Sequence, residues 1–249
     1  MSLKISNLSV SVLQKQIIHK FSLEIKKNEV HVLMGPNGSG KSSLSFALMG
    51  HPEYKITGGS INIDGKDITN LNSSEKANAG LFLAFQKPVP VYGVCYFNFL
   101  RNIYLNFHKN NDKISSIKQF LNLIRNKAKL LKIKEELVKK SVNDQMSGGE
   151  QKKMEILTMA LISPKYAVLD EIDTGLDVDA LKTVAAGIQI LKKDSGILLI
   201  THYQRILKYL KPDFVHILVK GRIVSTGNAD LADEIEEEGY KKYITAPAF

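Results

Sequence analysis

The sequence has little that could cross-link the chain or anchor it in a membrane. It contains a single cysteine, Cys95, among 249 residues, so no disulfide can form within the chain, which fits a reducing compartment. The longest uncharged stretch, which contains 89–100, is shorter than the roughly 20 apolar residues that span a bilayer. The first ten residues alternate apolar and polar side chains, unlike the apolar core of a secretory signal. We expect a soluble protein of the cytoplasm, or of an organelle stroma or lumen in a plastid-bearing eukaryote, without direct membrane insertion.

Acidic residues are outnumbered, but the basic excess does not indicate nucleic acid. The chain has 34 Lys+Arg against 25 Asp+Glu, a formal net charge of +9. The lysines are dispersed, and the aromatic residues do not alternate with them as base-stacking residues would. The densest basic stretch, 125–140, spaces its apolar residues at helical intervals, which is typical of the solvated face of a helix. Cys95 lies in an apolar run and is expected to be a small buried residue.

Short apolar runs predict a parallel sheet. Residues 31–34, 81–85, 166–170 and 196–201 are continuous apolar stretches of strand length. Such runs indicate strands buried on both faces, hence a mostly parallel sheet with helices on both sides. We therefore predict an α/β fold for a chain that is 44% hydrophobic and can bury a substantial core.

Two other regions depart from this pattern. Near the N-terminus, 3–10, 17–25 and 58–68 alternate and turn tightly like antiparallel strands, with Asp64-Gly65 as a hairpin signal and the first ten residues as an edge strand. Between Gln86 and Gln145 there is only helical periodicity. We predict one domain, 1–249, in which 1–85 and 146–249 form the α/β core with its antiparallel subdomain and 86–145 form a helical subdomain. The expected helices in and after the helical subdomain are 96–107, 115–131, 135–139 and an acidic helix, 229–240, that ends at Gly239.

A glycine-rich loop follows the first buried run. Residues 35–42 read GPNGSGKS and match G-x-x-x-x-G-K-[ST], with a predicted strand before and a helical run, 42–49, after them. Glycines let backbone N–H groups turn toward phosphate oxygens at a helix N-terminus, Lys41 adds charge at the β- and γ-phosphates, and the Ser42 hydroxyl coordinates Mg²⁺. The predicted nucleotide-binding residues are Gly35, Pro36, Asn37, Gly38, Ser39, Gly40, Lys41, Ser42 and Ser43.

Polar residues end three of the predicted strands. Asp170 and Glu171 follow one of them, and we expect Asp170 to hold Mg²⁺ and Glu171 to act as the general base that polarises water. Gln86 and His202 end two others, where Gln86 could bind magnesium or the lytic water and His202 could donate to the γ-phosphate. Each alone would be an ordinary polar residue at a strand end. Their convergence on one sheet edge favours a catalytic site with Glu171, His202 and Gln86, and with Ser42, Gln86 and Asp170 as magnesium ligands.

A second glycine pair stands where an amphipathic helix would tolerate neither residue. It belongs to Ser147-Gly148-Gly149-Glu150, which lies at the start of a predicted helix, 149–162. Together with the loop at 35–42, Gln86, the acids of 166–171 and His202, this stretch resembles the ATP-binding-cassette (ABC) ATPases over essentially the whole chain. The resemblance assigns these segments to Walker A, the Q-loop, the signature motif, Walker B and the H-loop, and assigns Asp177 to the D-loop.

Within that family the sequence resembles the SufC subfamily, the ATPases of the Suf iron–sulfur cluster assembly machinery. Residues 170–181 read DEIDTGLDVDAL, whereas most transporter cassettes are nearer to Asp-Glu-Pro-Thr-Ser-Ala-Leu-Asp after Walker B. The resemblance implies ATP and Mg²⁺ as cofactors. It also implies a head-to-tail dimer of two copies around two ATP molecules, in which the signature motif of one copy covers the nucleotide of the other. A helix N-terminus beginning at Gly149 suits that role.

The resemblance also points to partners. The uncharged stretch after Gln86 lies where cassette ATPases dock their mechanical partners, and its aromatics suit a binding patch, although they could equally pack in the helical core. These aromatics are Tyr92, Tyr96, Phe97 and Phe99. Expected partners are a second copy and Suf scaffold subunits of the SufB and SufD type. The alternatives are a membrane-transporter subunit and a cassette acting on nucleic acid or ribosomes, although the latter generally carries two cassettes in tandem.

One feature departs from the family. Transporter cassettes commonly stack the adenine on an aromatic residue of the N-terminal hairpin, and 10–18 contains none. Val12 or Ile18 are the apolar residues that could replace it. No base-contacting residue is predicted.

Overall fold

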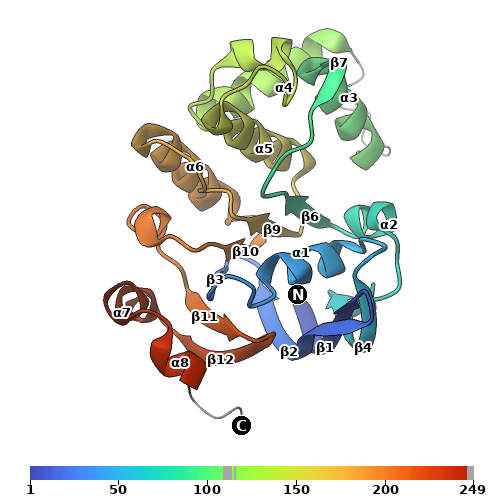
Figure 1. Cartoon of the computed structure of the whole chain (residues 1–249). Helices are drawn as coiled ribbons and strands as arrows, with labels where there is room; N and C mark the ends of the chain where they lie inside the picture. The colour runs from blue at the N-terminus through green and yellow to red at the C-terminus, as the bar shows by residue number, and fades with distance from the viewer. Residues whose placement is uncertain (109–113, 115, 246–249) are drawn as a thin grey trace. The chain divides into compact units, whose positions relative to one another are not determined.

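A computed structural model describes residues 1–108, 114 and 116–245 of the chain, so that residue 115, the first of the predicted helix 115–131, lies outside the described part. The chain divides into two compact units (Figure 1). The first contains Met1–Gln86, Pro164–Ile172 and Lys192–Phe249, and the second contains Lys87–Ser163 and Asp173–Leu191.

The first unit is built on a six-stranded sheet, which confirms the predicted α/β class. Its order is β12-β11-β3-β10-β9-β6. All neighbours are parallel except β11 and β12, which pair antiparallel. The strands are β3 (Val30–Met34), β6 (Leu81–Ala84), β9 (Tyr166–Asp170), β10 (Gly196–Ile200), β11 (Phe214–Val219) and β12 (Arg222–Gly227). The first four are the predicted apolar runs, and every residue of β3, β9 and β10 is buried.

A second, antiparallel sheet has the order β2-β1-β4-β5. Its strands are β1 (Ser2–Val12), β2 (Lys15–Lys26), β4 (Lys55–Ile63) and β5 (Lys66–Asp67). The expectation that the first ten residues form an edge strand was wrong, because β1 pairs with β2 on one side and with β4 on the other. The antiparallel pairing and the turn at Asp64-Gly65 are as predicted.

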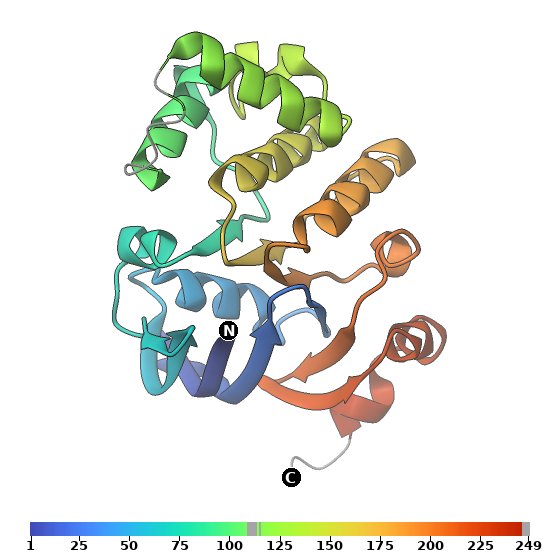
Figure 2. The same cartoon turned by 180° about the vertical axis from the view of Figure 1, so that it is seen from behind.

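Helix α1 (Lys41–Met49) joins the two sheets of the first unit. Its buried residues Leu44, Ala47 and Leu48 belong to one hydrophobic core with residues of both sheets, among them Ile5 and Val168. Both views place α1 between the sheets (Figure 1, Figure 2). The remaining helices of this unit are α2 (Ser73–Asn78), the 3₁₀ turn η2 (Gln204–Ile206), α7 (Asp230–Glu238) and α8 (Lys241–Thr245), and α7 ends at Gly239 as predicted.

The second unit is mostly helical. It contains α3 (Tyr96–Phe107), α4 (Ile117–Leu130), the 3₁₀ helix η1 (Glu135–Lys139), α5 (Gly148–Ile162) and α6 (Val178–Leu191). Helices α5 and α6 pack so closely that a Cβ atom on Gly187 would lie 2.6 Å from Ile156 Cγ2. This packing gives the unit a larger extent than the 86–145 lobe expected from the sequence.

A two-stranded sheet in this unit corrects the prediction of helices alone between Gln86 and Gln145. Strand β7 (Val91–Cys95) pairs antiparallel with β8 (Ser141–Val142). Neither leaves a buried-strand signal, because β7 is exposed along most of its length and β8 has only two residues. Within the described residues, no helix combines the length and apolar character that crossing a bilayer requires.

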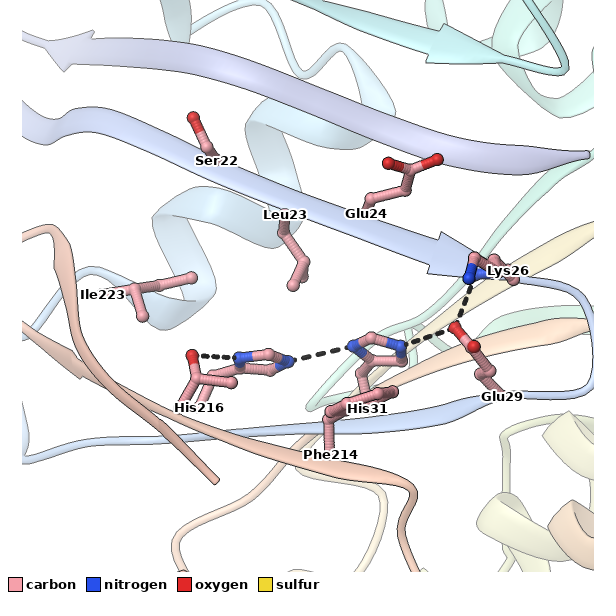
Figure 3. Close-up of a pocket in the computed structure, with 10 residues that line it drawn as sticks. Ser22, Leu23, Glu24, Lys26, Glu29, His31, Phe214, His216 and Ile223 are labelled. Atoms are coloured by element: carbon pink, nitrogen blue, oxygen red, sulfur yellow. Dashed lines mark hydrogen bonds and ion pairs between the residues drawn. The ribbon is translucent and has the colours of Figure 1, made fainter. Parts of the chain in front are cut away.

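Two buried histidines form a polar cluster in the first unit (Figure 3). His31 on β3 lies 2.9 Å from His216 on β11, Nδ1 to Nε2, and its Nε2 lies 3.0 Å from Glu29 Oε2. His216 Nδ1 lies 2.9 Å from Thr226 Oγ1. With Glu29 as an acceptor, His31 accepts from His216, which in turn accepts from the Thr226 hydroxyl. The rings line a hollow of about 380 Å³, but among the described residues no group of three or more His, Cys, Asp or Glu could hold a metal ion.

This cluster predicts acid sensitivity of the fold. Burial, with a smaller effect of His31, lowers the pKa of His216 from 6.5 to about 4. In the unfolded chain His216 becomes protonated near pH 6.5, whereas in the folded chain it stays neutral until about pH 4. The free energy of unfolding therefore falls as the pH drops from 6.5 toward 4. His216→Gln, whose amide can still donate to His31, should lose about 2 kcal/mol less stability than the wild type between pH 7 and pH 5. Urea unfolding at both pH values measures this, and parallel losses in the two proteins would contradict it.

Candidate active site

The glycine-rich loop connects β3 to α1 and is held by close backbone packing. A Cβ on Gly35 would lie 2.1 Å from Leu218 O, and one on Gly40 would lie 2.8 Å from Ile18 Cδ1. Gly40, which precedes α1, has a φ of 108°, a conformation that only glycine adopts readily. Ser39 O accepts from Gly221 N at 2.8 Å. The loop therefore needs glycine at these positions even before a ligand is considered.

Lys41 lies inside this loop, only 5% exposed. Its Nζ donates to the carbonyl oxygens of Gly35 at 2.9 Å and Pro36 at 3.0 Å. Burial lowers the pKa of Lys41 to about 8, and the nearby Glu171 and Asp170 carboxylates oppose that shift. At neutral pH the side chain is thus mostly a cation placed among loop residues that can contact phosphate.

Asp170 ends β9 as a buried carboxylate, 3% exposed. Its Oδ1 atom is buried and has no hydrogen-bond partner. Burial raises the pKa of Asp170 to about 6, and the hydroxyls of Ser45 and Ser42 act in the opposite direction. An unsatisfied carboxylate oxygen beside serine hydroxyls fits a divalent cation, because Mg²⁺ binds one or two protein oxygens and completes its shell with water and substrate phosphates. Ser42 and Asp170 are the residues that would hold it.

Glu171, Gln86 and His202 meet at the end of the core sheet. Glu171 Oε2 accepts from Gln86 Nε2 at 2.5 Å, and Glu171 Oε1 lies 2.9 Å from His202 Nε2. The Glu171 backbone is held in an unusual conformation, with a φ of 48°, and its N–H donates to Ile200 O at 2.8 Å. The structure thus brings together three side chains that the sequence placed separately at strand ends.

The pKa of His202 is set by its burial and by the charges around it. Burial and the positive charge of Lys41 lower the pKa of His202, while Glu171 raises it less. A neutral imidazole whose Nε2–H points to a carboxylate is a hydrogen-bond donor at neutral pH. This is the state in which His202 can share a proton with an oxygen near Glu171.

The signature segment begins helix α5 in the second unit. Ser147 is the N-cap: its Oγ accepts from Glu150 N at 3.2 Å, while Glu150 Oε2 accepts from Ser147 N at 2.9 Å. The two glycines differ in their surroundings. A Cβ on Gly149 would lie 3.1 Å from Ala180 Cβ, whereas one on Gly148 would meet no atom within 4 Å. Packing inside the unit thus explains Gly149 but not Gly148.

Other predicted residues have local roles that the sequence did not reveal. Asp177 is the N-cap of α6, since its Oδ1 accepts from Ala180 N at 2.7 Å. Ile18 is fully buried against Gly40, so it is not free to contact an adenine, whereas Val12 is partly exposed.

The aromatic patch proposed at 89–100 has to be revised. Tyr92 is 75% exposed, but Tyr96 is 2% exposed and belongs to the core of the second unit. Phe97 packs edge-on against Phe120, and Phe99 packs against Tyr96. Of the four predicted aromatics, Tyr92 is the exposed one, Phe97 and Phe99 are half-buried, and Tyr96 is buried.

Sequence comparison identifies the family. The sequence pattern of the family described as ABC transporter matches residues 18–174. Vegetative protein 296 of Bacillus subtilis is 46% identical to the chain, covering 96% of it and 92% of that protein. The probable ATP-dependent transporter ycf16 of Antithamnion sp. is 44% identical, covering 96% of each.

Solved structures agree with the fold. The nucleotide-free ATP-binding cassette of an ABC transporter has a TM-score of 0.78 at 23% identity, covering all of both chains. The dimeric ABC transporter cassette MJ0796 has a TM-score of 0.73 at 19% identity, covering 91% of this chain and 98% of that one. With the family match over most of its length, the chain belongs to the ABC ATPases, which are ATP-hydrolysing P-loop proteins.

Proposed function

We propose that this ATPase is a SufC-type subunit, which dimerises around two ATP molecules and drives conformational change in the scaffold of the Suf iron–sulfur cluster assembly machinery. The observation that carries the proposal is the sequence of 170–181, DEIDTGLDVDAL, which is of the SufC form and differs from that of most transporter cassettes. The similarity of relatives over almost the whole chain, against 23% or less for the two solved transporter cassettes named above, is consistent with a separate subfamily.

In the proposed reaction Glu171 accepts the proton of the attacking water. In the nucleotide-free chain Gln86 donates to one of its oxygens and His202 lies against the other, so both side chains orient the carboxylate. Lys41 neutralises charge on the β- and γ-phosphates, and the Nε2–H of His202 turns from Glu171 to the γ-phosphate as charge shifts onto it. When bound at Ser42 and Asp170, Mg²⁺ would supply Lewis-acid neutralisation of the phosphate oxygens.

The signature segment is proposed to act on the nucleotide of a second copy. Gly148 lacks an internal reason to be glycine, and it begins a 15-residue helix whose N-terminus favours an anion. A γ-phosphate presented by another copy would meet Ser147 and the N–H groups of that first turn. Dimeric cassette structures with this fold are known, including the MJ0796 dimer in a post-hydrolysis state with ADP and Pi.

A membrane transporter subunit is the alternative function. Several relatives, such as those of Streptococcus pyogenes at 46% identity, are named probable ABC transporter ATP-binding proteins. These names favour a partner embedded in a membrane. The SufC form of 170–181 instead favours a scaffold complex that can be purified without detergent. The partner that co-purifies therefore decides between the two functions.

Replacement of the proposed base should separate binding from hydrolysis. Glu171→Gln keeps the size and hydrogen-bonding reach of the side chain but removes its basicity, so turnover should fall by about 100-fold or more. Affinity for Mg-ATP should stay within about three-fold, because the phosphate loop is unchanged. Turnover at saturating Mg-ATP and fluorescence titration measure the two effects, with the exposed Glu53→Gln as the control. Wild-type turnover in Glu171→Gln would rule out the assignment.

Complementation tests the shared site. Lys41→Ala should abolish tight ATP binding, and Ser147→Arg should block the surface offered to the partner's nucleotide, so each variant alone should be nearly inactive. Mixed dimers contain one composite site with an intact loop and an intact signature, and should recover up to about a quarter of wild-type turnover. Association of the two variants is verified by pull-down through different tags. If associated mixtures recover no turnover, the arrangement in trans is wrong.

Affinity purification from the native host tests both the partner and the patch. Without detergent, the tagged chain should recover SufB- and SufD-type subunits, identified by mass spectrometry. Tyr92→Glu should reduce that recovery about ten-fold, since a charge at an exposed aromatic contact is costly to bury. Leu13→Glu, at a side chain 94% exposed in the β1–β2 turn, is the matched control. Recovery only of detergent-solubilised proteins would favour the transporter, and full recovery with Tyr92→Glu would place the contact elsewhere.

A further inference from the structure

The loop that leads into the signature segment has an unusual backbone. Residues 143–146, which we name the approach loop, connect β8 to the N-cap of α5. Two of them have positive φ angles without being glycine, Asn143 at 54° and Gln145 at 52°. Asparagine tolerates this conformation better than most residues. The position of Ser147 therefore depends on a short loop whose first residue is an asparagine in a conformation that few residues adopt.

Asn143 connects this loop to three other segments. Its Nδ2 donates to Val89 O at 3.1 Å, and its Oδ1 accepts from the hydroxyl of Tyr96, the first residue of α3. Its backbone oxygen accepts from Gln151 Nε2 at 3.0 Å, in the first turns of α5. One residue thus links the exposed segment before β7, the start of α3 and the helix that carries the signature.

A parallel connection reinforces this link. Tyr96 N donates to Lys140 O at 2.9 Å, and Lys140 Nζ donates to Glu150 Oε1 at 2.9 Å. Glu150 forms the capping box with Ser147, the N-cap of α5. Tyr96 is buried, and burial raises the pKa of its phenol, so the hydroxyl stays protonated and donates to Asn143. The exposed 89–92 stretch is thus linked to the first turn of α5 by one short hydrogen-bonded route, through Asn143, and the start of α3 has a second route, through Lys140.

We propose that Asn143 is a positioning residue for the signature segment, holding Ser147 and the first turn of α5 in register with the partner-docking stretch through its bonds to Val89, Tyr96 and Gln151. This inference rests on the proposed function, in which the signature contacts ATP on a second copy and 89–92 faces a scaffold subunit. A partner that moves Val89 and Tyr92 would alter the γ-phosphate contact without touching nucleotide. Asn143 gives the chain a specific point at which occupancy of the docking stretch changes hydrolysis.

Three variants separate the bonds of Asn143. Asn143→Gly tolerates the positive φ but removes both side-chain bonds, Asn143→Asp removes the donor to Val89 and keeps the acceptor for Tyr96, and Tyr96→Phe removes the hydroxyl alone. Asn7→Gly is the matched control, because Asn7 is exposed and has a similar φ of 49°. Thermal unfolding of each variant establishes that it is folded.

The variants are expected to lower kcat while leaving the affinity for ATP nearly unchanged. Asn143→Gly should lower kcat about ten-fold, since small misplacements of a contacting group are costly, with ATP affinity within about two-fold of wild type. Asn143→Asp and Tyr96→Phe should give intermediate losses. Because the hydroxyl acts through Asn143, adding Tyr96→Phe to Asn143→Gly should lower kcat no further. Hydrogen exchange of the amides of 148–151 in the nucleotide-free chain should become about ten-fold faster in Asn143→Gly and stay unchanged in Asn7→Gly.

The outcomes distinguish this inference from the function on which it rests. Unchanged exchange at 148–151 in Asn143→Gly, or additive losses in the double variant, overturns the positioning role whatever the turnover. Ser147→Arg is assayed alongside: if it leaves turnover intact, the proposed site in trans fails, and the exchange measurement still decides whether Asn143 positions the segment. A loss of ATP affinity equal to the loss of kcat would also overturn the inference, since Asn143 would then act on binding.

Discussion

The parallel register of four strands is the constraint on which the first unit depends. Strands β3, β10, β9 and β6 run side by side in one direction, so the residues that follow them emerge at the same edge of the sheet. That edge collects the phosphate loop, Asp170-Glu171, Gln86 and His202 from parts of the sequence more than a hundred residues apart. No single motif contains the site, and its arrangement depends on the pairing of strands whose side chains are mostly apolar.

The glycines of the loop at 35–42 and of the signature segment at 147–150 are required for different structural reasons. Gly35 and Gly40 are required by neighbouring atoms of the same unit, and Gly149 by Ala180, whereas Gly148 has free space around it. Glycine content alone therefore does not identify a ligand contact. Gly148 is the position at which a side chain would fit within the unit and is nevertheless absent, and the proposed contact with a second copy would account for that absence.

Much of the fold could be predicted from the sequence, because continuous apolar runs and the strand–loop–helix pattern around Lys41 are local signals. The role of the first strand was mispredicted, because pairing partners are not local, and β7 with β8 was missed because exposed or two-residue strands leave no hydrophobic pattern. From the sequence, Glu171, Gln86 and His202 are expected at one sheet edge, but their mutual contacts depend on the sheet order. The sequence left open whether Tyr96 lies in a surface patch or in the core, because an aromatic side chain suits both, and the buried pair His31 and His216 belongs to no recognisable motif.

The Lys41 ammonium donates hydrogen bonds to the Gly35 and Pro36 carbonyls, and so bonds to the backbone of its own loop. In the proposed function, an arriving triphosphate competes with those two carbonyls for the Lys41 ammonium, so the heat released on binding is the difference between two sets of charge-assisted hydrogen bonds. The Lys41 ammonium therefore holds the loop backbone in the nucleotide-free chain and contacts the phosphates in the proposed function. Selectivity for a triphosphate then depends on how many oxygens it offers in exchange, and a ligand with too few has no enthalpic advantage over the protein's own backbone.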